Sequence, residues 1–104
     1  MTAELAGATR VTARAVRRIA QLAAARSAGV EPSAPVVAIS DRGGALALDV
    51  ATPVATPPAG ESVVTIATAV AAAVRAAVQD DARRRIADLH VRVSGLREER
   101  RRPA

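Results

Sequence analysis

The residue types that most often carry chemistry are sparse in this sequence, and they gather around its single histidine. His90 lies in the segment Asp88-Leu89-His90-Val91-Arg92, in which polar and apolar residues alternate. Residues two apart in a strand project from the same face, so Asp88, His90 and Arg92 are expected to lie together. A hydrolytic triad would also need a nucleophile and an enclosed pocket. No serine stands in a nucleophile-elbow motif, so the pattern favours a surface ion cluster.

Two further motifs do not meet the requirements of a ligand site. Asp80 and Asp81 are adjacent on an expected helix, where their side chains diverge by about 100° and do not converge on one cation. The turn at 41–44, Asp-Arg-Gly-Gly, lacks the P-loop pattern and precedes a strand rather than a helix. Cysteine is absent, which excludes disulfides, zinc–thiolate centres and thiol nucleophiles. We therefore expect no cofactor, no metal site and no enzymatic activity.

Arginine is the polar residue type best represented, and it is the main candidate for binding. The chain has 15 basic residues, all arginine, against 10 acidic ones, and its net charge is +5. Clustered guanidinium groups bind phosphates of nucleic acids or of an anionic membrane surface. The chain has no aromatic residue on which bases would stack, so a nucleic-acid-binding module is the alternative rather than the preferred interpretation. The candidate anion or partner contacts are Arg14, Arg17, Arg83, Arg84, Arg85, Arg100, Arg101 and Arg102.

Hydrophobic periodicity predicts the elements that position these groups, in the order helix, strand, strand, helix, strand. Thr12 and Ser62 are suitable helix N-caps, and Gly29 is a suitable stop. The glycines of the 41–44 turn supply the positive φ angles of a tight hairpin. The expected bounds are 12–28 and 62–81 for the helices, and 34–40, 45–54 and 86–94 for the strands.

Each expected element has one apolar face, which predicts an α+β two-layer sandwich with two helices on one face of a three-stranded sheet. The crossover from the second strand to the third should be right-handed, so these two strands run in the same direction. We place the third strand beside the first, antiparallel to it, in preference to beside the second. Pro53 indicates that the second strand ends at an edge or stops pairing there. The apolar face of the first helix is expected to contain Val11, Ala15, Ile19 and Leu22, with Val16 and Ala23 beside them.

The 104 residues form one domain at most. We expect a flexible N-terminus at 1–10, a single domain at 11–96 and a disordered arginine-rich tail at 97–104. The apolar stretch Val63 to Val78 contains Arg75 and is shorter than the roughly 20 residues of a spanning helix. With no secretory signal visible, the expected location is the cytoplasm, with membrane contact only through a partner or a charged surface.

Three segments also carry a family pattern through their order and spacing. They are VTARAVRRIAQLAAARSAGV, ALALDVATPVA, and VAAAVRAAVQDD followed by ADLHVRVSGL, and they span about residues 11–96. Together they resemble the alkaline-shock protein family, small cytoplasmic Gram-positive proteins linked to cell-envelope stress. Asp49 stands at the aspartate of the family's Val-Ala-Val-Asp-Leu strand, whereas residues 51–54 depart from the aromatic or longer aliphatic residues that follow it there.

The resemblance implies a non-catalytic protein of the envelope stress response or of envelope homeostasis. Such a protein would assemble with itself or bind a membrane-anchored protein at the cytoplasmic face. The departure at 51–54 leaves the expected fold unchanged but implies that the partner surface differs there from that of the family.

Overall fold

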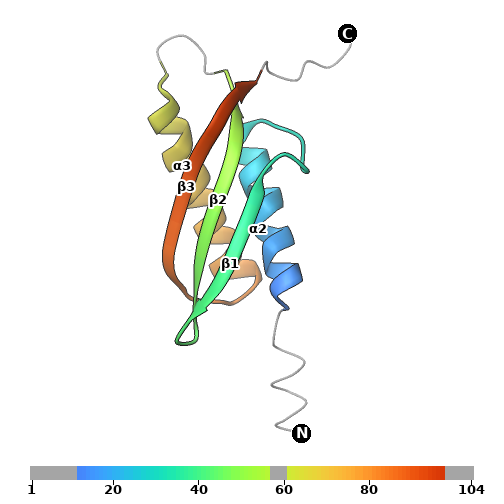
Figure 1. The fold of residues 1–104 in the computed structure, drawn as a ribbon, viewed down its shortest axis with the longest axis vertical. Helices are drawn as coiled ribbons and strands as arrows, with labels where there is room; N and C mark the ends of the chain where they lie inside the picture. Colours follow the sequence, from blue (N-terminus) through green and yellow to red (C-terminus); the bar gives the residue numbers. More distant parts are fainter. Residues whose placement is uncertain (1–11, 57–60, 98–104) are drawn as a thin grey trace, which may run out of the picture.

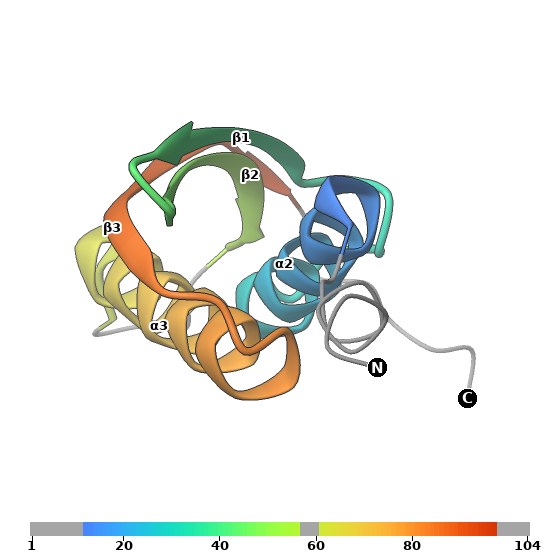
Figure 2. The ribbon, with the colours of Figure 1, turned by 90° about the horizontal axis from the view of Figure 1, so that it is seen from below.

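The computed structural model describes residues 12–56 and 61–97, which form two helices packed on one three-stranded sheet. The helices lie on the same side of a strongly curved sheet (Figures 1 and 2). This arrangement confirms the predicted α+β two-layer sandwich. The elements are α2 (Ala13–Ala28), β1 (Val36–Arg42), β2 (Ala45–Ala55), α3 (Val63–Ala76), the π-helical turn η1 (Ala77–Asp81) and β3 (Ile86–Arg97).

The helix ends are set by the predicted capping residues. The hydroxyl of Thr12 accepts a hydrogen bond from the Ala15 N–H at 3.1 Å, and the hydroxyl of Ser62 accepts one from the Thr65 N–H at 3.1 Å. These bonds satisfy N–H groups that have no partner inside the helix. Gly29 ends α2 in the left-handed region, with a φ of 76°, which a glycine adopts without steric cost.

The second helix does not end as a regular α-helix but widens into η1. The Ala82 N–H donates to the Ala77 carbonyl five residues earlier, at 3.4 Å, which is the bonding pattern of a π turn. Val78 in this turn is fully buried, like Val70 and Val74 before it. The predicted helix at 62–81 is therefore present, with its last turn widened.

The strand order is β1-β2-β3, with β1 antiparallel and β3 parallel to β2. The preference for the third strand beside the first was wrong. Strand lengths give the physical reason: β2 and β3 have 11 and 12 residues, whereas β1 has 7. A pairing of β3 with β1 would leave much more backbone without partners. The connection through α3 passes behind the sheet and is right-handed, as predicted (Figure 1).

The far end of β2 continues past the end of β1. The β1–β2 register stops at the pair Val36 and Ala51, so Pro53 is unpaired on that side, as its missing N–H requires. On the other side Pro53 lies opposite Gly95, next to a bulge. The third strand thus runs through Gly95 to Arg97 and is longer than the predicted 86–94. Position 97, assigned to the tail by sequence, belongs to the sheet.

The core consists mainly of valine and alanine. On α2 the buried line is Val16, Ala20, Ala24 and Ala28, spaced four residues apart, while Ala15, Ile19 and Leu22 are only partly buried. The predicted apolar face of this helix was therefore rotated from the true one, and Val11 lies outside the described residues. Small side chains let the α2 backbone approach its neighbours closely, although each contributes little buried area. The remaining core residues include Leu46, Leu48, Val50, Val54, Val70, Val74 and Val78.

The α3–η1 helix is apolar and yet largely exposed. The helix has 19 residues, Val63–Asp81, and an 18-residue window of it, 17% of which is buried, has a mean hydropathy of 1.4. By length and composition alone it is long enough to cross a membrane. In this fold Val70, Val74 and Val78 pack into the core. On the other side Val64 is 74% exposed, and Ala69, Ala72 and Ala76 are also exposed.

Candidate interaction surface

The face of the sheet opposite the helices has no covering layer among the described residues. Successive side chains of a strand point to opposite faces of the sheet, so every second residue of each strand projects to this side. The strand register places small residues on β1 and β2 and charged residues toward β3. We call this the helix-free face, and its three central rows across the sheet are Val36–Ala51–Arg92, Ala38–Asp49–His90 and Ser40–Ala47–Asp88.

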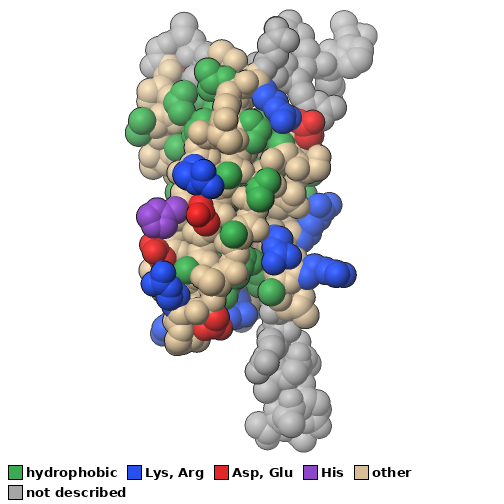
Figure 3. Space-filling model, viewed as in Figure 1, with side chains coloured by type: hydrophobic (Ala, Val, Ile, Leu, Met, Phe, Trp, Pro, Cys, Tyr) green, Lys and Arg blue, Asp and Glu red, His purple; other side chains and the backbone are tan. Residues whose placement is uncertain are grey.

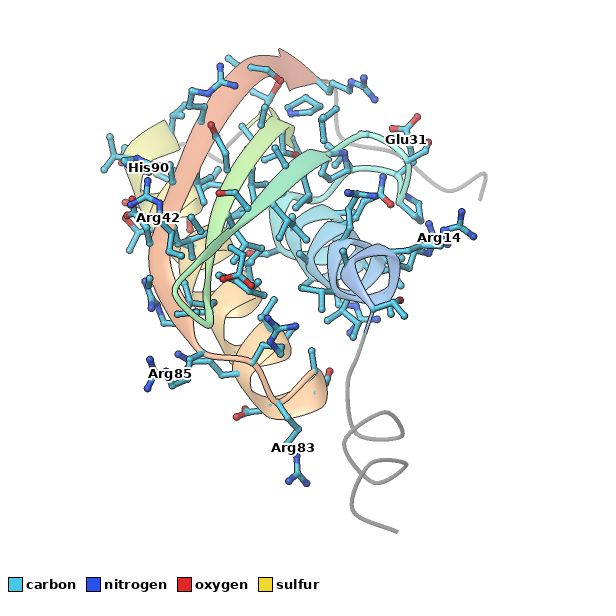
Figure 4. The ribbon with its side chains drawn as sticks, turned by 60° about the horizontal axis from the view of Figure 1, so that its bottom comes forward. Arg14, Glu31, Arg42, Arg83, Arg85 and His90 are labelled. Atoms are coloured by element: carbon cyan, nitrogen blue, oxygen red, sulfur yellow. The ribbon has the colours of Figure 1, made fainter. Side chains whose placement is uncertain are left out.

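A shallow hollow of about 360 Å³ lies on the helix-free face. Ala38, Ser40 and Ala47 have short side chains and leave its floor low, while longer charged side chains stand around it. Arg42 and His90 lie on the same side of the molecule (Figure 4), and both line the hollow. Figure 3 shows this side of the molecule as a mixture of acidic, basic and small apolar patches.

Two exposed ion pairs border this surface. The His90 Nε2 atom lies 3.6 Å from Asp88 Oδ2, and the Arg92 Nε atom lies 3.7 Å from Asp49 Oδ1. The predicted location of Asp88, His90 and Arg92 on one face is confirmed, although Arg92 pairs across to β2. All four side chains are at least 47% exposed, and water screens such pairs strongly. The charges therefore shape what this face can bind more than they stabilise the fold.

The geometry around His90 differs from that of a catalytic or metal centre. Its side chain is 72% exposed, so no enclosed pocket holds an imidazole against a nucleophile. Within residues 12–56 and 61–97, no group of three or more His, Cys, Asp or Glu side chains is placed to hold a metal ion. The arrangement is suited to contacts with another macromolecule, through small side chains and charges of both signs.

The described arginines among the candidate contacts do not form one basic surface. Arg14 and Arg17 are exposed on α2, whereas Arg83 and Arg85 are exposed in the connection before β3. Arg14, Arg83 and Arg85 point away from one another (Figure 4). Arg84 is partly buried and lines a smaller hollow of about 200 Å³. Arg100, Arg101 and Arg102 lie outside the described residues.

One tertiary ion pair was not predicted from the sequence. Arg97 Nη1 lies 2.6 Å from Glu31 Oε1, and the carbonyl of Arg97 accepts a hydrogen bond from the Thr56 hydroxyl at 3.1 Å. These contacts connect the end of β3 to the loop after α2 and to the end of β2. The sequence signal was weak because Ser94 and Gly95 interrupt the alternation that would have extended the strand.

Comparison with known proteins gives a likeness at the level of the fold. No family model and no curated protein matches the chain. A solved structure of the MamM C-terminal domain, a histidine-to-glutamate variant in a zinc form, is similar with a TM-score of 0.51. It is 27% identical, and the match covers 84% of this chain and 86% of that one. The chain shares its fold with the MamM C-terminal domain.

Proposed function

We propose that this chain is a non-catalytic protein-binding domain that acts through its helix-free face. The observation that carries the proposal is the uncovered second side of the sheet. There a low floor of small residues is bordered by Asp49, Asp88, His90 and Arg42. Protein interfaces have a less charged centre surrounded by a polar rim, whereas a catalytic site needs groups converging in an enclosed pocket. The likeness to a C-terminal domain, which is a module of a larger protein, also favours protein partners.

The biological setting that we propose is the cell envelope. Its support is the resemblance of the helix, hairpin and closing-strand segments to the alkaline-shock family. In this proposal the domain works in envelope stress response or homeostasis at the cytoplasmic face. It does so by assembling with itself or by binding a membrane-anchored protein. Nucleic acid is the less favoured partner because Arg14, Arg83 and Arg85 point in different directions (Figure 4).

The test is affinity capture of detergent-solubilised membrane proteins on the immobilised full chain, alongside light scattering of the purified chain. The informative variant is Ala38→Arg, because Ala38 is exposed on the hollow's floor and a long cation there fills the hollow. We expect membrane proteins that bind the unmodified chain to be lost by this variant. Ser33→Arg is the matched control, since Ser33 is exposed in the loop before β1 and adds the same charge away from the face.

Two results would contradict the proposal. One is a chain that is monomeric at every concentration and retains no membrane protein. The other is equal capture by the unmodified chain and the Ala38→Arg variant, which would remove the helix-free face from the interaction. A salt titration against duplex and single-stranded nucleic acid completes the comparison, because phosphate contacts give a steep loss of affinity with salt.

A further inference from the structure

The third strand forms an open edge of the sheet. It has 12 residues and is bonded on one side only, to β2. Within residues 12–56 and 61–97, no other backbone pairs with its outer edge. An exposed edge strand presents unpaired N–H and C=O groups, which favour pairing with a strand of another chain unless something prevents it. No proline lies within Ile86–Arg97, and the register is regular from Asp88 to Val93 between the two bulges.

The charge pattern of this regular segment is complementary to the same pattern read in the opposite direction. Read along the strand, the helix-free face presents Asp88, His90 and Arg92, an acid and a base at equal distances from the histidine. In an antiparallel pair of two such strands with His90 at the centre, Asp88 lies opposite Arg92 of the second copy, and Arg92 opposite its Asp88. Directly opposite residues have Cβ atoms roughly 5 Å apart, close enough for an ion pair.

Other arrangements of the same two strands lose this match. A parallel pair in register places Asp88 beside Asp88 and Arg92 beside Arg92, which is repulsive. An antiparallel pair shifted to centre on Val91 places Asp88 opposite Ser94 and Arg92 opposite His90. The side chains of Asp88 and Arg92 are 47% and 70% exposed, and their present ion pairs are 3.6 and 3.7 Å long. Both groups are therefore free to change partners.

The helical layer agrees with this arrangement. Helix α3 packs on the side of the sheet behind β3 (Figure 2). A second copy joined at the β3 edge places its own α3 on the same side of the extended sheet, next to the first. From Val64 to Ala76 the exposed positions of α3 carry a single charge, Arg75. A neighbouring helix would cover part of this apolar surface, which the single chain leaves exposed.

We propose that β3 pairs antiparallel with β3 of a second copy of this chain, centred on His90, forming a continuous six-stranded sheet. The inference rests on the proposed function and adds to it a second copy of the chain as one partner, bound at the β3 edge. It also gives the charges of Asp88 and Arg92 a purpose, because charges on an edge usually block pairing. Here they permit one orientation and one register.

Charge reversal tests the pairing directly, and analytical sedimentation of the full chain measures it. The buffer contains EDTA, so that metal ions cannot link two copies through His90. Interference optics are needed because the chain lacks aromatic residues. The unmodified chain should show a monomer–dimer equilibrium. Asp88→Arg and Arg92→Asp should each weaken the dimer by about tenfold to hundredfold, since two attractive pairs become repulsive in each dimer.

The decisive sample is an equimolar mixture of the two variants. One copy then carries two arginines and the other two aspartates, so that a heterodimer should form with both charge pairs restored. A variant that failed to fold would not give this rescue. The control is Arg42→Asp, which makes the charge change of Arg92→Asp on the opposite edge strand and should leave the dimer unchanged.

An unmodified chain that stays monomeric overturns the inference, as does a mixture that fails to dimerise or an equal loss with Arg42→Asp. Each of these results leaves the proposed function standing, because its test is capture of membrane proteins with and without Ala38→Arg. Conversely, Ala38 lies on β1, so the Ala38→Arg variant should remain a dimer even where it loses other partners.

Discussion

The junction between α2 and the sheet gives a prediction about stability, in which a second glycine of the same chain serves as the reference. Gly29 ends α2 with a φ of 76°, and its N–H donates to the Ala25 carbonyl at 2.9 Å. A Cβ added at Gly29 would lie 3.2 Å from the Cβ of Ala55, at the end of β2. Gly29→Ala therefore introduces two separate costs, a left-handed backbone with a side chain and a contact that is too close.

The second glycine that separates these costs is in the hairpin. Gly43 has a φ of 61°, and nothing lies within 4 Å of a Cβ added there. The left-handed conformation costs alanine about 1–2 kcal/mol, and reduced freedom of the unfolded chain offsets roughly 0.4–1 kcal/mol of this. Gly43→Ala should thus lower the free energy of unfolding by about 1 kcal/mol.

Gly29→Ala should lower the free energy of unfolding by about 2 kcal/mol, because the crowded contact adds about 1 kcal/mol to the same backbone cost. The corresponding fall in Tm is roughly 8–16 °C for a domain of this size. Urea unfolding followed by far-UV circular dichroism measures both variants, since the chain has no tryptophan for fluorescence.

Adding Ala55→Gly to Gly29→Ala should recover the contact cost, measured relative to Ala55→Gly alone. Equal destabilisation by Gly29→Ala and Gly43→Ala would refute the reasoning, because it would show that Ala55 does not crowd this position. So would a double variant that recovers nothing.

Two further predictions concern packing and charge. Val74→Ala should lower the free energy of unfolding by about 2 kcal/mol, because Val74 is fully buried and the loss of two methyl groups leaves a cavity. Urea unfolding measures this change, and a change near zero would place this side of α3 outside the core. Glu31→Gln and Arg97→Gln, combined in a double-mutant cycle, should give a coupling of about 0.2–1 kcal/mol that falls with added salt, since both side chains are more than 40% exposed; a salt-independent coupling would contradict this ion-pair assignment.

The element bounds were largely predictable because local rules set them. Thr12 and Ser62 begin helices by bonding the first free N–H groups, Gly29 ends one, and Gly43 and Gly44 permit the tight turn through positive φ angles. Alternation identified which side of each strand faces the helices. It therefore placed Asp88, His90 and Arg92 together on the opposite side, and these groups form much of the candidate surface.

The features that sequence did not predict depend on pairing between distant segments. Periodicity says which face of β3 is apolar but not which strand lies beside it, and the preferred neighbour was wrong. On α2, the three–four spacing of apolar residues placed Ile19 and Leu22 on the buried face, yet close packing buries Ala20 and Ala24 instead. The pair between Arg97 and Glu31 depended on a strand that continues past Gly95, where no local signal shows it.

The strand order also determines when this chain can complete its fold during synthesis. The β1–β2 hairpin pairs neighbouring segments, but Leu46 of β2 pairs with Ile86, so one whole side of the central strand waits for β3, the last 12 described residues. At roughly 5–20 residues per second, translation from Ala55 to Arg97 takes about 2–8 s. Throughout that interval β2 can pair on one side only, with β1. Until β3 is made, β2 is itself an edge of the sheet, and its pairing with β3 closes that edge and leaves β3 as the new one.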